Sequence, residues 1–373
     1  MSAQESPSHK LLYDYGMTVD SIAALQEGTD TARYSRQVRR IAKRVSKTGI
    51  VRIPGLPAFR KSVMSQIQYL KRSPDINGEA SANLEEAWKL LTEAGIYERA
   101  SEANRSSQGD PSDACHWVRK LSEAHEVNPY DFLLWSSPEA DTCERITTGK
   151  TFLTATEMEN SEKYQDAESA VTTDRNEEQV SNELRLFASV SRSFKIIDPY
   201  VLKNLIGEAQ NTWLSDTGRR WADSLKSIDR VLFEERHTPK KNPLERLEIH
   251  TWRDKEVCCG RGESYPTRKY VEESGVLNLI ADCMAQSVEN CTSEVTLHLW
   301  ECPPGKCRPL HDRWLLSGGR GITIPRGVDY ASDREEEIDL KLMGQSERER
   351  YARRTNPNQG YFGHVDSWPI SLK

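Results

Sequence analysis

A polar tripeptide near the end of the chain, His311-Asp312-Arg313, carries side chains that could bind an anion. The short apolar runs after it favour a β-hairpin, and residues i and i+2 of a strand point to the same side. His311 and Arg313 therefore share a face, and a hairpin that folds back brings Arg326 near them. Guanidinium groups are costly to bury unpaired, whereas each charge-assisted hydrogen bond to a phosphate contributes about 1.5–3 kcal/mol. These three residues predict a phosphate pocket.

Other charged residues around the hairpin leave alternatives open. An acidic neighbour, Asp312 or Asp329, could hold one of the arginines in a buried ion pair, which would make the tripeptide a structural element. Arg320, inside the Gly-Gly-Arg-Gly run, could extend the pocket, but we expect it to be a solvated side chain beside a hairpin turn. Backbone N–H groups of the same glycine-rich turn could also reach a phosphate.

Two cysteines before the tripeptide, Cys302 and Cys307, raise the question of a zinc site with His311. Their spacing is wider than that of the commonest zinc knuckle, and a closed structural site needs four ligands. Cys258 or Cys259 would have to complete the site from a distance. We therefore expect no metal and no cofactor.

The second half of the chain alternates strand-like and helix-like segments that would position the tripeptide. Three runs rich in β-branched and aromatic residues are expected to be neighbouring strands of one sheet: residues 194–197, 247–252 and 295–300. Shorter strands are expected at 314–316 and 322–324, and helices at 201–213, 221–230 and 266–288. This order predicts an α/β fold, with a mixed sheet and crossover helices.

Two segments of this half resemble the phospholipase D-like superfamily. The segment KIIDPYVLKNL is similar to the first strand and helix of that domain, and LHDRWLLSGGRGITIPRGVDY is similar to its signature hairpin. The hairpin is of the His-Asp-Arg type followed by Arg-Gly-x-Asp, as in the C-terminal domain of MIT-domain proteins and in bacterial proteins linked to phage defence. The resemblance covers roughly the last half of the chain.

The resemblance assigns roles to individual residues. In catalytic members, the histidine of a His-x-Lys motif attacks phosphorus while the lysine holds the phosphate oxygens. His311 matches the nucleophile, and Arg313 stands in the place of the lysine, where it can grip a phosphate with two hydrogen bonds. Ser317 or Gly318 replaces the aspartate of the motif, and a single motif per chain means that a full active site needs a two-fold dimer. The resemblance therefore supports phosphate recognition better than catalysis.

The expected function follows from that pocket. We expect a protein that engages a phosphodiester or phosphate, with nucleic acid as the favoured partner, either by binding alone or as a metal-independent phosphodiesterase or nuclease. It would act as a homodimer or as a partner subunit of a bacterial antiphage defence complex. The alternatives are a non-catalytic interaction or sensor subunit that binds a partner protein, and a binder of lipid headgroups such as the MIT-type relatives.

The first half of the chain matches no family pattern. We expect residues 1–32 to be a polar arm, residues 33–140 a mostly helical module, residues 141–186 a polar linker or peripheral helices, and residues 187–373 the phospholipase D-like domain. The run AWKLLTEAGIYERA resembles the last helix and turn of winged-helix modules, although it is equally an ordinary amphipathic helix. The basic run of residues 36–47 could contact a nucleic-acid backbone or be a solvated helix face.

Composition limits the class of protein. The chain has 373 residues, a net charge of −6 and 36% hydrophobic residues, which fits two globular domains and gives no overall attraction to nucleic acid. Apolar runs are too short for a membrane span, and the N-terminal segment lacks the apolar core of a signal peptide. The eight cysteines are irregularly spaced. We therefore expect a cytoplasmic protein with reduced thiols and no transmembrane segment.

Overall fold

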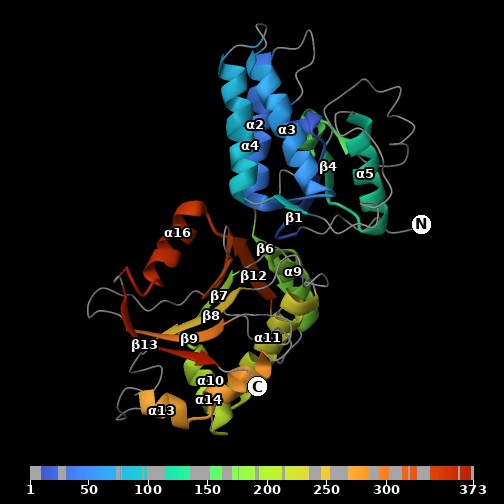
Figure 1. Cartoon of the computed structure of the whole chain (residues 1–373). Coiled ribbons are helices and arrows are strands. Elements are labelled where there is room, and N and C mark those ends of the chain that lie inside the picture. Colours follow the sequence, from blue (N-terminus) through green and yellow to red (C-terminus); the bar gives the residue numbers. More distant parts are fainter. Residues whose placement is uncertain are drawn as a thin grey trace, which may run out of the picture. The chain divides into compact units, whose positions relative to one another are not determined.

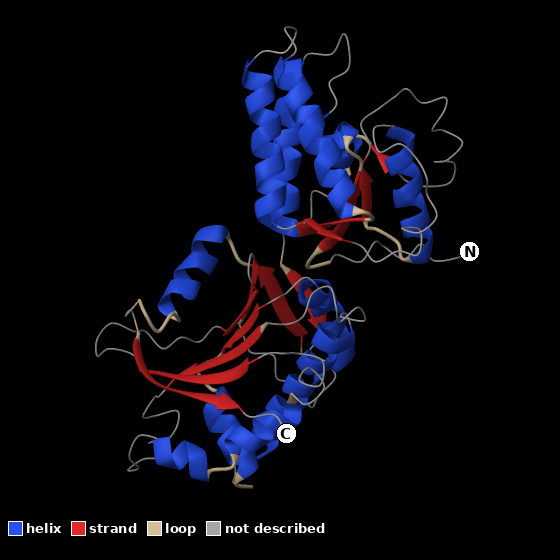
Figure 2. Ribbon diagram, in the orientation of Figure 1, coloured by secondary structure: helices blue, strands red, loops and turns tan. Residues whose placement is uncertain are grey.

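The computed structural model divides the chain into two compact units, Met1–Ser169 and Ala170–Lys373. Their elements are labelled in Figure 1 and coloured by type in Figure 2. The structure describes residues 10–23, 31–72, 76, 78–94, 96–98, 114–134, 152–161, 170–174, 176–189, 193–211, 215–234, 245–252, 268–284, 294–301, 313–317, 320–325, 337–359 and 362–370. The boundary between the units lies inside the expected linker, residues 141–186. Three elements lie within that stretch: β5 (Phe152–Leu153), α7 (Ala155–Asn160) and β6 (Val171–Asp174). A fourth, α9 (Glu177–Ser189), begins there.

A parallel sheet forms the centre of the N-terminal unit. Its other strands are β1 (Tyr13–Met17), β2 (Gly49–Ile53), β3 (Ile96–Glu98) and β4 (Phe132–Leu134). The order is β3-β2-β1-β4-β5, with all pairings parallel. The middle strand β1 comes from the range that we expected to be a polar arm. Its acidic residue Asp14 is neutralised inside the sheet by Arg52, whose Nη2 lies 2.5 Å from the carboxylate, so β1 can be buried along its whole length.

Besides α7, five helices accompany this sheet among the described residues. Four are long, α2 (Thr31–Thr48), α3 (Leu56–Arg72), α4 (Gly78–Ala94) and α5 (Ala114–Val127), and one is short, α1 (Asp20–Ala23). Helices make up most of the described residues of this unit, but a five-stranded parallel sheet that we did not expect lies at its core.

The basic run of residues 36–47 lies on α2. The apolar side of this helix is buried through Val38, Ile41 and Val45, and α2 packs along α4. Three of its arginines form ion pairs within the unit: Arg36–Glu79 at 3.6 Å, Arg39–Glu86 at 2.6 Å and Arg40–Glu159 at 3.3 Å. Such exposed pairs contribute little stability, but they leave α2 with less uncompensated positive charge for a nucleic-acid backbone than the sequence alone indicates.

A mixed sheet forms the centre of the C-terminal unit. Its strands after β6 are β7 (Ser193–Ile197), β8 (Arg246–Trp252), β9 (Glu294–Glu301), β10 (Arg313–Ser317), β11 (Arg320–Ile324), β12 (Glu337–Leu342) and β13 (Gly363–Ile370). The order is β13-β9-β8-β7-β10-β11-β12-β6. Strands β7, β8 and β9 are parallel neighbours, which confirms the prediction for residues 194–197, 247–252 and 295–300. The hairpin of β10 and β11 is also confirmed, and β10 pairs antiparallel with β7.

Helices lie on both faces of this sheet. Figure 1 shows α9, α10 (Val201–Ala209), α11 (Ser215–Glu234), α13 (Arg268–Glu273) and α14 (Val276–Cys283) on one face, and α16 (Gln345–Arg354) on the other. Side chains alternate along a strand, so Ile196 faces the larger helical layer while Ile197 faces the side of α16. On that second side, Ile197, Trp314 and Tyr351 belong to one buried apolar cluster. The mixed α/β architecture that we expected is therefore present.

The described cysteines are in two different states. Cys115 on α5 is disulfide-bonded, so the expectation of reduced thiols is wrong at this position. The cysteine bonded to it lies outside the described residues. Cys283 on α14 is a free, buried thiol.

Among the helices of the described ranges, none is long and apolar enough to cross a membrane.

Candidate functional site

Arg313, the one residue of the tripeptide that the structure describes, is held where β10 enters the sheet. Its Nε donates to Asp198 Oδ2 at 3.2 Å, and its Nη1 donates to the carbonyl oxygen of Pro325 at 3.1 Å. The guanidinium lies over the ring of Tyr200, 4.8 Å from the centroid. One partner of Arg313 is therefore an aspartate 115 residues earlier in the chain, which the sequence did not single out as a partner.

Asp198 joins two distant segments at this point. It follows β7 directly and is fully buried. Its Oδ1 accepts a hydrogen bond from the backbone N–H of Tyr200 at 2.6 Å, while Oδ2 accepts from Arg313. The carboxylate thus fixes the turn from β7 into α10 and the start of β10 together. This ion pair therefore joins the β7–α10 segment to the β10–β11 hairpin.

The remaining candidate residues of the hairpin fall into two groups. Four of them lie outside the described residues: His311, Asp312, Arg326 and Asp329. Arg320 is described and lies at the other end of the hairpin, because it pairs with Ser317 whereas Arg313 pairs with Ile324. Along β10, Arg313 and Ser317 are four residues apart, which corresponds to roughly 13 Å. Arg320 is also only 7% exposed, so the expectation of a solvated side chain is wrong, and its backbone is not beside that of Arg313.

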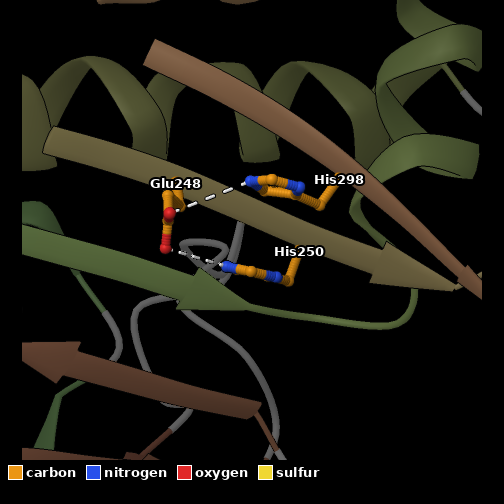
Figure 3. A group of neighbouring side chains, drawn as sticks. All are labelled: Glu248, His250 and His298. Atoms are coloured by element: carbon orange, nitrogen blue, oxygen red, sulfur yellow. Dashed lines mark hydrogen bonds and ion pairs between the residues drawn. The ribbon is translucent and has the colours of Figure 1, made fainter. Parts of the chain in front are cut away.

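A second group of titratable side chains lies on the sheet face that carries Ile197. We call it the buried polar cluster, and it comprises Lys195 on β7, Glu248 and His250 on β8, His298 on β9 and His364 on β13. The strand register places Lys195 opposite Glu248, and His250 opposite His298. Figure 3 shows both of these imidazole rings extending toward Glu248. Glu248, His250 and His298 are all buried.

Glu248 is the anionic centre of the buried polar cluster. Its Oε2 lies 2.5 Å from Lys195 Nζ and 3.4 Å from His250 Nε2. Its Oε1 lies 3.9 Å from His298 Nε2. Burial by itself raises the pKa of Glu248, but the hydrogen bonds from His250 and Lys195 outweigh it and bring that pKa down to about 2. Glu248 is therefore ionised at neutral pH.

The indole of Trp300 sets the protonation of His250. Trp300 Nε1 donates to His250 Nδ1 at 3.0 Å, and an indole nitrogen can only donate. Nδ1 must therefore carry a lone pair, so the proton of the neutral ring is on Nε2 and points to Glu248. Burial, more than any charge nearby, lowers the pKa of His250 to about 4. His250 is thus a neutral link between the indole and the carboxylate.

His298 connects the cluster to the edge strand β13. Its Nδ1 lies 3.5 Å from Nε2 of His364, and its ring is stacked on that of His250 with 4.7 Å between centroids. Burial first, and then the neighbouring His250, lowers the pKa of His298 to about 3. The His298 Nε2 atom is buried and has no hydrogen-bond partner among the residues that the structure describes.

Ligand atoms of Glu248, His250 and His298 lie within 4.8 Å of one another, close enough to consider a metal ion at their centre. Three contacts oppose it. The ammonium group of Lys195 already occupies the carboxylate. Trp300 places a proton on the His250 nitrogen that would have to coordinate. The stacked rings, with 14° between their planes, lie side by side instead of converging. These three residues therefore do not fit a shared metal ion.

The buried polar cluster and Arg313 face opposite sides of the sheet. Lys195 and Ile197 share one face, and Asp198, the partner of Arg313, follows Ile197 and turns to the other. They are two separate sites. The sequence contained a signal for the cluster in the period-two patterns Glu248-x-His250 and His298-x-Trp300, which place polar side chains on one face of predicted strands.

No family model, no curated protein and no solved structure matches this chain.

Proposed function

We propose that the C-terminal unit binds a phosphate-bearing ligand, with a nucleic-acid strand as the favoured one, at the sheet end marked by Arg313. The observation that supports this most is the alignment of the Arg313 guanidinium by Asp198 and by the ring of Tyr200. A guanidinium held in one orientation loses less side-chain entropy when it binds a phosphate than a mobile one does.

The location also favours an anion. Strands β7 and β8 are parallel and end at Ile197 and Trp252, and β10 begins beside the end of β7. In open α/β sheets, ligands bind outside the carboxyl ends of parallel strands. The nine-residue helix α10 begins at Val201, directly after this edge, and the positive end of its dipole attracts anions.

The activity that we propose is binding without turnover. The resemblance to phospholipase D-like proteins supports a phosphodiester as the ligand, with His311 and Arg326 beside Arg313. Hydrolysis would need a second motif from a homodimer or a partner subunit. Arg313 also shares its charge with the buried carboxylate of Asp198, which suits a fixed recognition element better than a group that must follow a transferring phosphoryl.

Binding of a fluorescently labelled single-stranded oligonucleotide tests the proposal. We expect Arg313→Lys, which keeps the ion pair but loses the planar fork, and Arg326→Ala each to weaken binding roughly 10- to 100-fold, the equivalent of one charge-assisted hydrogen bond. Fluorescence anisotropy at two salt concentrations measures this, with inorganic phosphate as competitor and EDTA present throughout.

The matched control is Arg219→Ala, which removes a 63%-exposed arginine from α11. It should bind as the wild type does. Equal binding by Arg313→Lys, Arg326→Ala and the wild type would contradict the proposal. Cleavage of the oligonucleotide in EDTA that His311→Ala abolishes would replace binding alone by catalysis. Flotation with anionic vesicles, without oligonucleotide binding, would favour a lipid headgroup instead.

A further inference from the structure

We propose that His298 and His364 hold a divalent transition-metal ion, of the class of Zn²⁺, Ni²⁺ or Cu²⁺, between strands β9 and β13. Nδ1 of His298 and Nε2 of His364 face each other at 3.5 Å. Two imidazole nitrogens on one tetrahedral zinc ion, each at ~2.0–2.1 Å, are roughly 3.4 Å apart. The ring centroids are 5.6 Å apart with 55° between the planes, so these rings meet by their nitrogen edges, unlike the stacked pair of His250 and His298.

The strand pairing holds the two ligands in place. In the antiparallel pair of β9 and β13, His364 lies opposite Trp300, two residues beyond His298 on the same face. The register shifts between His364 and Asp366, and such a bulge re-aims the side chain beside it. His364 is half-buried on an edge strand, so an ion can reach it from solvent, and water or an exogenous anion can complete the coordination.

The other nitrogen of His298 provides independent support. Nε2 is buried without a hydrogen-bond partner among the described residues, and Glu248 Oε1 lies 3.9 Å away. A histidine that binds a metal through one nitrogen carries a proton on the other and usually donates it to a carboxylate. A metal ion on Nδ1 would give Nε2 the proton that faces Glu248. Lys195 and His250 keep this carboxylate ionised, so Glu248 is a positioning residue and not a ligand.

Isothermal titration of tag-free, EDTA-treated full-length protein with Zn²⁺ and with Ni²⁺ tests the site. We expect one ion of each to bind the wild type. His364→Gln and His298→Gln should lose that binding, and Glu248→Gln should weaken it roughly 10- to 100-fold, the usual effect of removing a carboxylate behind a metal-binding histidine. X-ray absorption of the zinc-loaded protein should show two imidazole nitrogens.

The matched control is His125→Gln on α5 of the N-terminal unit, which should bind the ion as the wild type does. Circular dichroism checks each variant for folding. His364 lies on an edge strand and is half-buried, so His364→Gln decides the matter even where a buried variant fails to fold. Zinc binding by His364→Gln equal to that of the wild type would place the ion on other groups and overturn the proposal.

Discussion

Replacing Arg313 with alanine is expected to lower the free energy of unfolding of the C-terminal unit by about 3–5 kcal/mol. The substitution takes the Arg313 guanidinium away from the fully buried carboxylate of Asp198, and it removes the contact with the ring of Tyr200. Hydrogen exchange of peptides from β7 and β10 measures the loss where it occurs, because a chain with two units need not unfold in a single step.

The double variant Arg313→Ala with Asp198→Asn separates charge from packing. The asparagine oxygen can still accept the backbone N–H of Tyr200, and the negative charge at position 198 is gone. This variant should recover a large part of the lost stability. If Arg313→Ala alone leaves exchange in β7 and β10 unchanged, the ion pair does not tie the two strands together, and the proposed alignment of the guanidinium loses its basis.

Acidification from pH 7 to pH 4 is expected to destabilise the same unit, by about 3 kcal/mol from His250 alone. The pKa of this buried imidazole falls from 6.5 to about 4 on folding. The unfolded chain therefore takes up the proton first, so the stability present above pH 6.5 is lost as the pH drops to 4. The pKa of His298 is lowered too, and its contribution has the same sign. The lowered pKa of Glu248 adds a further loss below about 4.5.

The variant His250→Gln tests the source of this pH dependence. Glutamine can accept from Trp300 and donate to Glu248, but it does not titrate. Hydrogen exchange of β8 peptides, corrected for the intrinsic effect of pH, should therefore depend less on pH in this variant than in the wild type. Parallel profiles for the two proteins would mean that His250 is not the titrating group.

Strands β8 and β9 of the C-terminal unit were predictable because both their residue types and the segments between them indicate neighbouring β-strands. Residues 247–252 and 295–300 combine β-branched and aromatic side chains with helical segments of crossover length between them, so both identity and adjacency could be predicted. Strands β12 and β13 were missed because their sequences, EIDLKL and GHVDSWPI, contain charged residues or proline. Strand β13 lies at the edge of its sheet, where such residues are tolerated. Strand β12 has neighbours on both sides, and its charged side chains alternate with buried ones on an exposed face.

The N-terminal unit was harder to predict because its central strand is short and contains a charge. Asp14 makes the segment YDYGM look polar, and only the fold shows that Arg52 reaches it from β2. The sequence predicted a mostly helical module but could not show that its helices accompany a parallel sheet. A local pattern carries no information on partners 38 residues away.

The candidate sites show the same division between local and long-range information. The tripeptide was found from spacing and resemblance, but its partner Asp198 comes from a segment 115 residues away. The buried polar cluster draws on four strands, and no single segment contains more than two of its members. Polar residues at alternate positions of a predicted interior strand are the signal that would have revealed it, because burial of such groups requires partners.

The order of strands in the C-terminal sheet governs how the chain can fold while a ribosome is still making it. β7 is synthesised early, yet its neighbour β10 follows more than 100 residues later, as the separation of 115 between Asp198 and Arg313 shows. β6 waits still longer for β12, with 167 residues between Thr172 and Asp339. Until then the edge of β7 that will pair with β10 keeps its backbone N–H and C=O groups open to other nascent strands. Non-local pairing of this kind slows folding and favours misassembly, so demand for chaperones should peak while β8 and β9 emerge.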